Sequence, residues 1–364
     1  MRKIAMALLL VCASMAIWVG CSNTISGRYL YAAIPQLNEL IVFREDPNSG
    51  ALTELVGSPI TAGQSVHALV IHPSKKFMYA ANSGENDISL FTIADSGALT
   101  EASIRTNSGG TGPTVLAIDP AGSYLYVGNS GSFDISVFSI DPTSGVLTAV
   151  PQLSGGTAAV GLSPLNIAIA PSSSTLYVTG QGFLGYVEAF PLNGGVLGSP
   201  LTDSPYQAGN NPYGLAISPD GSFLYTANKL DSSISEFPIN ADGSLGPQLA
   251  GSPIQDAYLG PVALLIDPSG TYLYTANQGS TNLAGFSIGS GGALNLLPSS
   301  PFATSGSNPS VIATDHSGSY LFVANQTSSG SSVESFSLNK SNGTLTVVAT
   351  YPLPGTATSL VLTK

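Results

Sequence analysis

One short pattern recurs seven times along this chain: an aromatic residue preceded by leucine, or once by methionine, and followed by small residues, as in "YLYVGN" and "YLYTAN". Successive copies are separated by 48, 47, 51, 48, 49 and 48 residues, counted at Tyr31, Tyr79, Tyr126, Tyr177, Tyr225, Tyr274 and Phe322. Apolar residues that alternate with small or polar ones over about six positions indicate a short β-strand. The chain is therefore built from repeated strand-containing units.

Three further strand-like patterns keep the same period. One ends at Phe43, Phe91, Phe138, Phe190, Phe237, Phe286 and Phe336. Another begins at Gly50, Gly97, Gly145, Gly195, Gly243, Gly292 and Gly343, and a third includes "ALVIHP", "VLAIDP" and "GLAISP". Four short strands in each of seven units predict an all-β protein, a seven-bladed β-propeller with four-stranded antiparallel blades over residues 28–364.

The ends of the chain predict how the ring closes. The first unit starts on "RYLYAA", which matches a second strand, and the chain finishes on "TSLVLTK", which matches a first strand. We expect the C-terminal strand to pair with the N-terminal strand, because this completes the seventh sheet and leaves no open edge at the junction.

An asparagine ends the recurring strand in five units, at Asn82, Asn129, Asn228, Asn277 and Asn325. Its side chain bonds nearby backbone and tolerates left-handed geometry, so we predict a structural role.

The N-terminus has the features of an export signal. Arg2 and Lys3 precede an apolar run that ends at Trp18, and "VGC" ends at Cys21. The run is too short to cross a bilayer comfortably. The segment resembles the lipobox of bacterial lipoproteins, which implies a signal peptide at 1–20, a lipidated Cys21, a tether at 21–27 and anchoring in the bacterial cell envelope. Trp18 departs from the usual leucine, so cleavage after Ala16 is the alternative.

Charge and cysteine content exclude several functions. The chain has 10 basic and 21 acidic residues, and loss of Arg2 and Lys3 leaves 8 − 21 = −13. So acidic a chain repels nucleic acid. Cys12 leaves with the signal, so Cys21 is the one cysteine of the mature chain, and the folded part has no disulfide, cysteine nucleophile or thiolate metal ligand. The sequence indicates no metal site and no cofactor.

The strands "YVGN" and "YTAN", with "SIDPTSGVLT" and "IDPSG", resemble those of the lactonase family of seven-bladed propellers, also called the YVTN type. The resemblance runs from about Gly27 to Lys364. It implies a propeller related to enzymes that hydrolyse 6-phosphogluconolactone or, in a fungal relative, cyclise carboxymuconate.

The catalytic motif of that family is missing. Active members carry Gly-Pro-Arg-His before the innermost strand, where this chain has Gly112-Pro113-Thr114-Val115 and Gly260-Pro261-Val262-Ala263. One unit offers His67, which is either a general base or a packed histidine. Among basic residues, Arg105 and Lys229 alone are expected near the mouth, too few for a sugar phosphate.

Aromatic residues form the other candidate site. The loops expected at the mouth contain Phe133, Phe183, Tyr186, Tyr206, Tyr213 and Tyr258. These rings either stack on a ligand or cover the small cores of their own loops. The sequence thus favours an exported binding or interaction module with a glycan, small-lactone or protein partner. The alternative is a lactone hydrolase with a divergent active site that uses His67.

Overall fold

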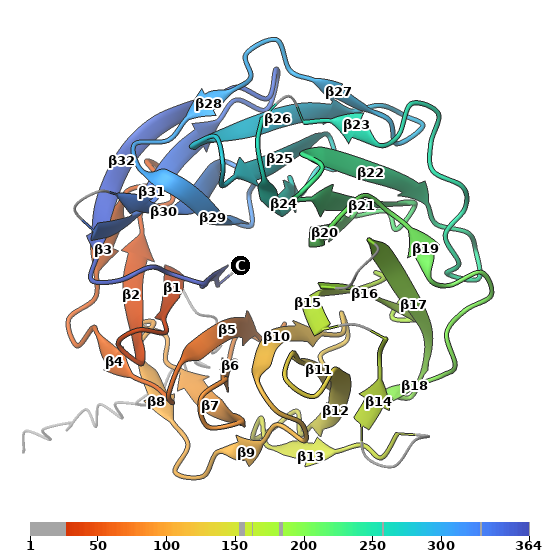
Figure 1. The fold of residues 1–364 in the computed structure, drawn as a ribbon. Helices are drawn as coiled ribbons and strands as arrows, with labels where there is room; N and C mark the ends of the chain where they lie inside the picture. Colours follow the sequence, from red (N-terminus) through yellow and green to blue (C-terminus); the bar gives the residue numbers. More distant parts are fainter. Residues whose placement is uncertain are drawn as a thin grey trace, which may run out of the picture.

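Seven antiparallel sheets stand around a common axis like the blades of a propeller (Figure 1), which confirms the predicted fold. The computed structural model describes residues 27–152, 157–161, 163–181, 185–256, 258–327 and 330–363. Phe183 and Cys21 lie outside these residues. No helix in the described ranges is long and apolar enough to cross a membrane.

We number the blades 1–7 in chain order. Blade 1 contains β1 (Arg28–Ile34), β2 (Glu39–Glu45), β3 (Leu52–Glu54), β4 (Ile60–Thr61) and β33 (Ser359–Leu362). Blade 2 contains β5 (Val66–Ile71), β6 (Phe77–Asn82), β7 (Asp87–Ile93), β8 (Leu99–Glu101) and β9 (Thr106–Asn107). Blade 3 contains β10 (Pro113–Ile118), β11 (Tyr124–Asn129), β12 (Asp134–Ile140), β13 (Leu147–Ala149) and β14 (Thr157–Ala159). Blade 4 contains β15 (Ser163–Ile169), β16 (Thr175–Gln181), β17 (Tyr186–Asn193), β18 (Val196–Leu197) and β19 (Tyr206–Gln207).

The last three blades follow the same order. Blade 5 contains β20 (Pro212–Ile217), β21 (Phe223–Asn228), β22 (Ser233–Pro238) and β23 (Ile254–Gln255). Blade 6 contains β24 (Pro261–Ile266), β25 (Tyr272–Asn277), β26 (Asn282–Ile288), β27 (Leu294–Leu296) and β28 (Phe302–Ala303). Blade 7 contains β29 (Ser307–Thr314), β30 (Tyr320–Thr327), β31 (Gly330–Leu338) and β32 (Leu345–Leu353). The first strand of each blade lies nearest the axis, and in most blades the outermost strand is split into two short pieces.

Neighbouring blades are joined by a repeated hydrogen bond. The buried hydroxyl of Tyr79 in blade 2 donates to the carbonyl of Gly145 in blade 3 at 2.7 Å. The same bond joins four other junctions: Tyr31 to Gly97, Tyr177 to Gly243, Tyr225 to Gly292 and Tyr274 to Gly343. Burial raises the pKa of Tyr79 far above its usual value, so this hydroxyl stays a donor.

Each acceptor must be glycine. Gly145 has a φ of 72°, in the left-handed region, and its Cα rests on the ring of Phe77 from the preceding blade. This contact explains why the aromatic series and the glycine series have one period.

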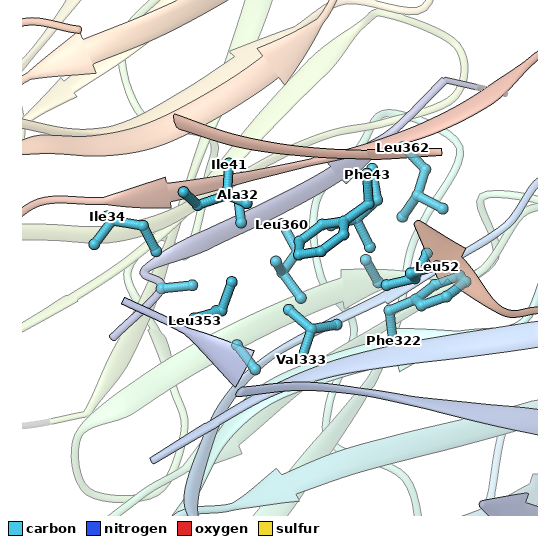
Figure 2. Close-up of a cluster of buried hydrophobic side chains, with 14 residues drawn as sticks. Ala32, Ile34, Ile41, Phe43, Leu52, Phe322, Val333, Leu353, Leu360 and Leu362 are labelled. Atoms are coloured by element: carbon cyan, nitrogen blue, oxygen red, sulfur yellow. The ribbon is translucent and has the colours of Figure 1, made fainter. Parts of the chain in front are cut away.

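The ring closes as predicted. β33 pairs with β1 from Leu30↔Leu362 to Ala33↔Ser359. In Figure 2, Leu360 and Leu362 from β33 lie among side chains of blade 1, such as Phe43, and of blade 7, such as Phe322.

An ion-pair network also spans this junction. Arg28 of β1 donates to Asp315 of blade 7 at 2.7 Å and lies 3.4 Å from Glu45 of its own blade. Burial and the nearby Asp315 raise the pKa of Glu45 to about 7, although Arg28 opposes the shift. The guanidinium therefore ties the first blade to the last.

The recurring asparagines have a structural role, as predicted, but they bond side chains of the third strand rather than nearby backbone, and none has a left-handed φ. Asn82 is buried and donates to Asp87 at 2.7 Å and to Ser89 at 2.9 Å on the next strand. Gly63, on the crossover into blade 2, packs so closely on Asn82 that a Cβ there would overlap it.

In blade 4 a different residue contacts the incoming crossover. It has Gly180 in place of the asparagine, and the carboxylate of Glu188 accepts the backbone N–H of the crossover residue Gly161. Glu334 of blade 7 likewise accepts the N–H of Ser305 at 2.9 Å. A polar side chain from the second or third strand thus meets the incoming crossover in these blades.

Deletion of residues 356–364 is expected to abolish cooperative unfolding, because it removes the only inner strand of blade 1 and exposes its core. The matched control Leu360→Ala should keep one transition and lose about 2–4 kcal/mol of unfolding free energy. Both are measured by chemical denaturation followed by circular dichroism. A deletion variant that unfolds like the intact chain would disprove the closure.

Candidate functional site

The propeller has two faces that differ in their loops. The mouth face carries the turns where second strands end, such as 35–38 and 229–232, and the starts of the inner strands. The opposite face carries the turns between first and second strands, such as 72–76 and 315–319. On the mouth face the side chain of Asn38 accepts the N–H of Ser65 at 2.7 Å, and that of Asn86 accepts the N–H of Gly112 at 2.7 Å, so these two turns fix the entries of the blades that follow.

A β-bulge opens the inner strand of blades 2–6. In blade 2, Val66 pairs with Asn82 and Ala68 with Ala81, which leaves His67 as the extra residue. The matching extra residues are Thr114, Leu165, Tyr213 and Val262. Bulges redirect side chains and often lie beside functional sites. The sequence contains the prolines that precede four of these bulges, but the repeat pattern alone did not reveal the extra residue.

His67 has an unusual environment for a histidine. Its backbone carbonyl accepts the hydroxyl of Thr358 at 2.7 Å, but its half-buried ring has no hydrogen-bond partner in the described part of the chain. Burial lowers the pKa of His67. The imidazole is therefore neutral near pH 7 and has a free nitrogen lone pair.

Arg105 is already occupied. Its Nη1 lies 2.6 Å from Glu85 and its Nε 2.8 Å from Glu101, and Glu85 also accepts the N–H of Gln64. A guanidinium held by two carboxylates is poorly placed to take up a further anion.

Lys229 is free of such pairing. Its ammonium group lies 5.3 Å from the ring centroid of Tyr213, a cation–π distance, and it makes no ion pair with any described residue. It borders a hollow of about 440 Å³ on the mouth face at blades 5–7. The lining residues are Lys229, Leu230, Ser232, Leu259, Gly260, Gln278, Gly279 and Asn308.

Two leucines stand exposed beside this hollow. Leu230 is 72% exposed in the turn between β21 and β22 of blade 5, and Leu259 is 62% exposed at the entry to blade 6. The sequence pattern does not reveal them, because one leucine in a turn such as "KLDSS" carries no periodic signal.

The structure separates the predicted aromatic set. Tyr206 is 7% exposed and donates to the carbonyl of Thr202, so its ring belongs to the core and is unavailable for stacking. Tyr258 and Tyr213 are half-buried against interblade cores, and Tyr186 is half-buried at the start of β17. Phe133 is 52% exposed at a turn in blade 3. Of the described members, Tyr213 has a contact with a lining residue of the hollow, through its ring beneath the ammonium group of Lys229.

A buried carboxyl lies behind the hollow. Asp256 is fully buried where the chain crosses from blade 5 to blade 6, and its N–H donates to the carbonyl of Ser232, a lining residue. Thr275 donates to its Oδ2 at 3.1 Å, while its Oδ1 has no partner among the described residues. Burial raises the pKa of Asp256 to about 8. Within the described residues, no group of three or more His, Cys, Asp and Glu side chains could hold a metal ion.

The fold and the repeats define a seven-bladed propeller of the lactonase type. The sequence model of the family "Lactonase, 7-bladed beta-propeller" matches residues 23–160, 152–256 and 254–362, so the chain belongs to this family. We found no match among curated proteins.

Solved structures show the same fold. The periplasmic gluconolactonase of Pseudomonas aeruginosa is similar with a TM-score of 0.74 and 19% identity, over 93% of this chain and 99% of that one. A Bacteroides uniformis protein with a provisional 6-phosphogluconolactonase assignment has a TM-score of 0.77 and 18% identity, over 93% and 99%. A Lactobacillus plantarum protein has 0.77 and 20%, also over 93% and 99%. At these identities the likeness concerns the fold alone.

The unfolding free energy should fall as pH rises through the window set by Asp256. The folded-state pKa, about 8, lies above the ordinary 3.8, so within this range the folded chain keeps a proton that the unfolded chain has lost. Between pH 5 and pH 8 the unfolding free energy of Asp256→Asn should therefore decrease by about 2–4 kcal/mol less than that of the wild type.

The matched control is Asp242→Asn, because Asp242 is an exposed turn residue whose pKa is lowered by hydrogen bonds from Ser244. It should keep the wild-type slope in urea titrations at each pH. Equal slopes for wild type and Asp256→Asn would contradict the assignment.

Proposed function

We propose that this protein is an exported, lipid-anchored binding module of the bacterial cell envelope, which takes up its partner at the mouth-face hollow. The observation that carries the proposal is the pair of exposed leucines beside the unpaired Lys229. Exposed apolar side chains around one free cation favour contact with a partner over solvent.

The shape of the hollow favours a large partner. Leucines that keep most of their surface exposed form shallow walls, whereas sites for small metabolites enclose most of the ligand. Gln278 adds a side-chain amide that pairs with hydroxyl or peptide groups, and Asn308, whose Nδ2 donates to Gln326 at 3.0 Å, adds an amide oxygen. A glycan or a protein surface satisfies both features.

Charge argues against a phosphorylated sugar lactone. A phosphate ester at neutral pH calls for several converging cations, and Arg105 is held by Glu85 and Glu101. Lys229 remains as the one base at the hollow among its lining residues.

Substitution of the hollow should weaken partner binding. Leu230→Ser and Lys229→Ala should each reduce affinity about tenfold or more, because each removes an exposed anchor while leaving the core intact. Binding is measured on an array of envelope oligosaccharides and on peptidoglycan fragments, with Lys340→Ala on the opposite face as the matched control. Unchanged binding in both mouth variants, or loss in the control, would refute the assignment.

A second candidate function rests on His67. Its neutral, partner-free imidazole can take a proton from a water molecule that attacks a lactone carbonyl, which yields the ring-opened hydroxy acid. The fold family supports this alternative, while the absence of the family's arginine at the matching bulges weighs against it.

A turnover assay separates the two functions. If the chain hydrolyses non-phosphorylated lactones, His67→Ala should reduce kcat/KM at least about 100-fold, as expected for loss of a general base. His316→Ala is the matched control, since His316 is exposed on the opposite face. No turnover above background, or equal loss in both variants, would dismiss the hydrolase.

A further inference from the structure

The chain enters the propeller at the face opposite the mouth. Arg28, the first residue of β1, bonds to Asp315 in the turn 315–319, which belongs to the opposite face. β1 then runs for seven residues toward the mouth and ends at Ile34, beside the turn that contains Asn38. Whatever precedes Gly27 therefore joins the opposite face at blade 1.

The length of the tether limits the orientation of an anchored chain. The six steps from Cys21 to Gly27 span at most about 22 Å when fully extended. A seven-residue strand is itself about 23 Å long, and loops extend beyond both of its ends. The tether is thus too short to pass along blade 1 and place the mouth face against a bilayer.

Basic residues gather around this point of entry. Five of the seven lysines and arginines in the described residues lie at the opposite face, all in blades 7, 1 and 2: Arg28, Arg44, Lys75, Lys76 and Lys340. The described opposite-face turns of blades 3–6 contain acids and no base. Two of the four acids in the basic sector, Glu45 and Asp315, are buried against Arg28, while Asp46 and Asp95 are exposed. Arg44 and the three lysines therefore outnumber the acids that face outward.

A largely apolar hollow opens at the border of this sector, between blades 1, 2 and 3. Its volume is about 470 Å³, and Val70, Ile71, Ile118 and Leu362 line it beside Lys75 and the buried Asp119. Apolar surface next to a lysine suits an interface with anionic lipid.

We propose that the opposite face of blades 7, 1 and 2 rests on an anionic bilayer surface, so that the mouth-face hollow points away from the membrane. The inference rests on the proposed anchoring at Cys21. Lys75, Lys76 and Arg44 pair with lipid phosphates at the anionic surface. The orientation leaves the mouth accessible to large partners.

Tryptophan fluorescence provides the test. The mature chain has no tryptophan, because Trp18 lies in the signal, so one introduced tryptophan is the only such fluorophore. Asn48→Trp places it on the exposed opposite-face turn of blade 1, and Leu37→Trp places it on the mouth-face turn of that blade. Residues 21–364 of each variant are coupled through the Cys21 thiol to a maleimide lipid in phosphatidylcholine–phosphatidylglycerol vesicles that contain a head-group nitroxide lipid.

Nitroxide quenching of Asn48→Trp should exceed that of Leu37→Trp at least about twofold, because the two sites lie about 23 Å apart along the blade. Replacement of phosphatidylglycerol by phosphatidylcholine, or the added changes Lys75→Glu and Lys76→Glu, should lower the quenching of Asn48→Trp. Equal quenching at both sites, stronger quenching at position 37, or insensitivity to charge would overturn the proposed orientation.

Failure of the anchoring itself is detected separately. The full-length sequence is expressed in bacteria, and the mass of the protein extracted from their membranes shows whether the signal is removed and Cys21 carries acyl chains. An unacylated mass refutes the proposed localisation, and with it the orientation in cells. An acylated mass with equal quenching at both sites refutes the orientation alone.

Discussion

A buried tyrosine hydroxyl that donates to a glycine carbonyl in the next blade is the contact on which the ring depends. It occurs at five junctions, and its geometry requires an aromatic residue on one second strand and a left-handed glycine about 66 residues later, as between Tyr79 and Gly145. One unmet hydroxyl or carbonyl inside the molecule would cost about 1–3 kcal/mol. The bond therefore sets the distance between blades, and with it the alignment of the mouth-face turns that form the hollow.

Much of this architecture could be predicted from sequence because each contact recurs. Tyr79 and Gly145 belong to two series with one period, and a period of about 48 residues leaves few alternatives to a propeller. The pairing of β33 with β1 could be inferred for a related reason. The first unit lacks its first strand and the chain ends on an additional first strand, so pairing the two completes the sheet. Because the contacts recur, sequence patterns with one period indicate which distant residues are in contact.

The candidate site has no such periodic pattern in the sequence, because its residues lie where the blades differ. Arg105 looked available until the structure placed Glu85, from a turn 20 residues earlier, against its guanidinium. Tyr206 is aromatic and lies in a long loop, yet its ring fills the core. The bulge that releases His67 and Tyr213 from the strand pairing depends on register, which the alternation of residues did not fix. Each of these features depends on a contact that occurs once in the chain, whereas the contacts that hold the blades recur.

The contrast between recurring contacts in the blades and single contacts at the mouth explains how a propeller of this family can change its chemistry without losing its fold. The tyrosine–glycine bonds, the asparagine contacts and the ring closure involve none of the five bulge residues, which are a histidine, a threonine, a leucine, a tyrosine and a valine. Four of these side chains are only half-buried, so their substitution should cost less stability than substitution of Val262, which is buried in a core cluster. Fold membership accordingly constrains the blades far more than it constrains what the mouth binds. The residues at the mouth, Lys229 with its two leucines and His67 at its bulge, are where the function of this chain must be sought.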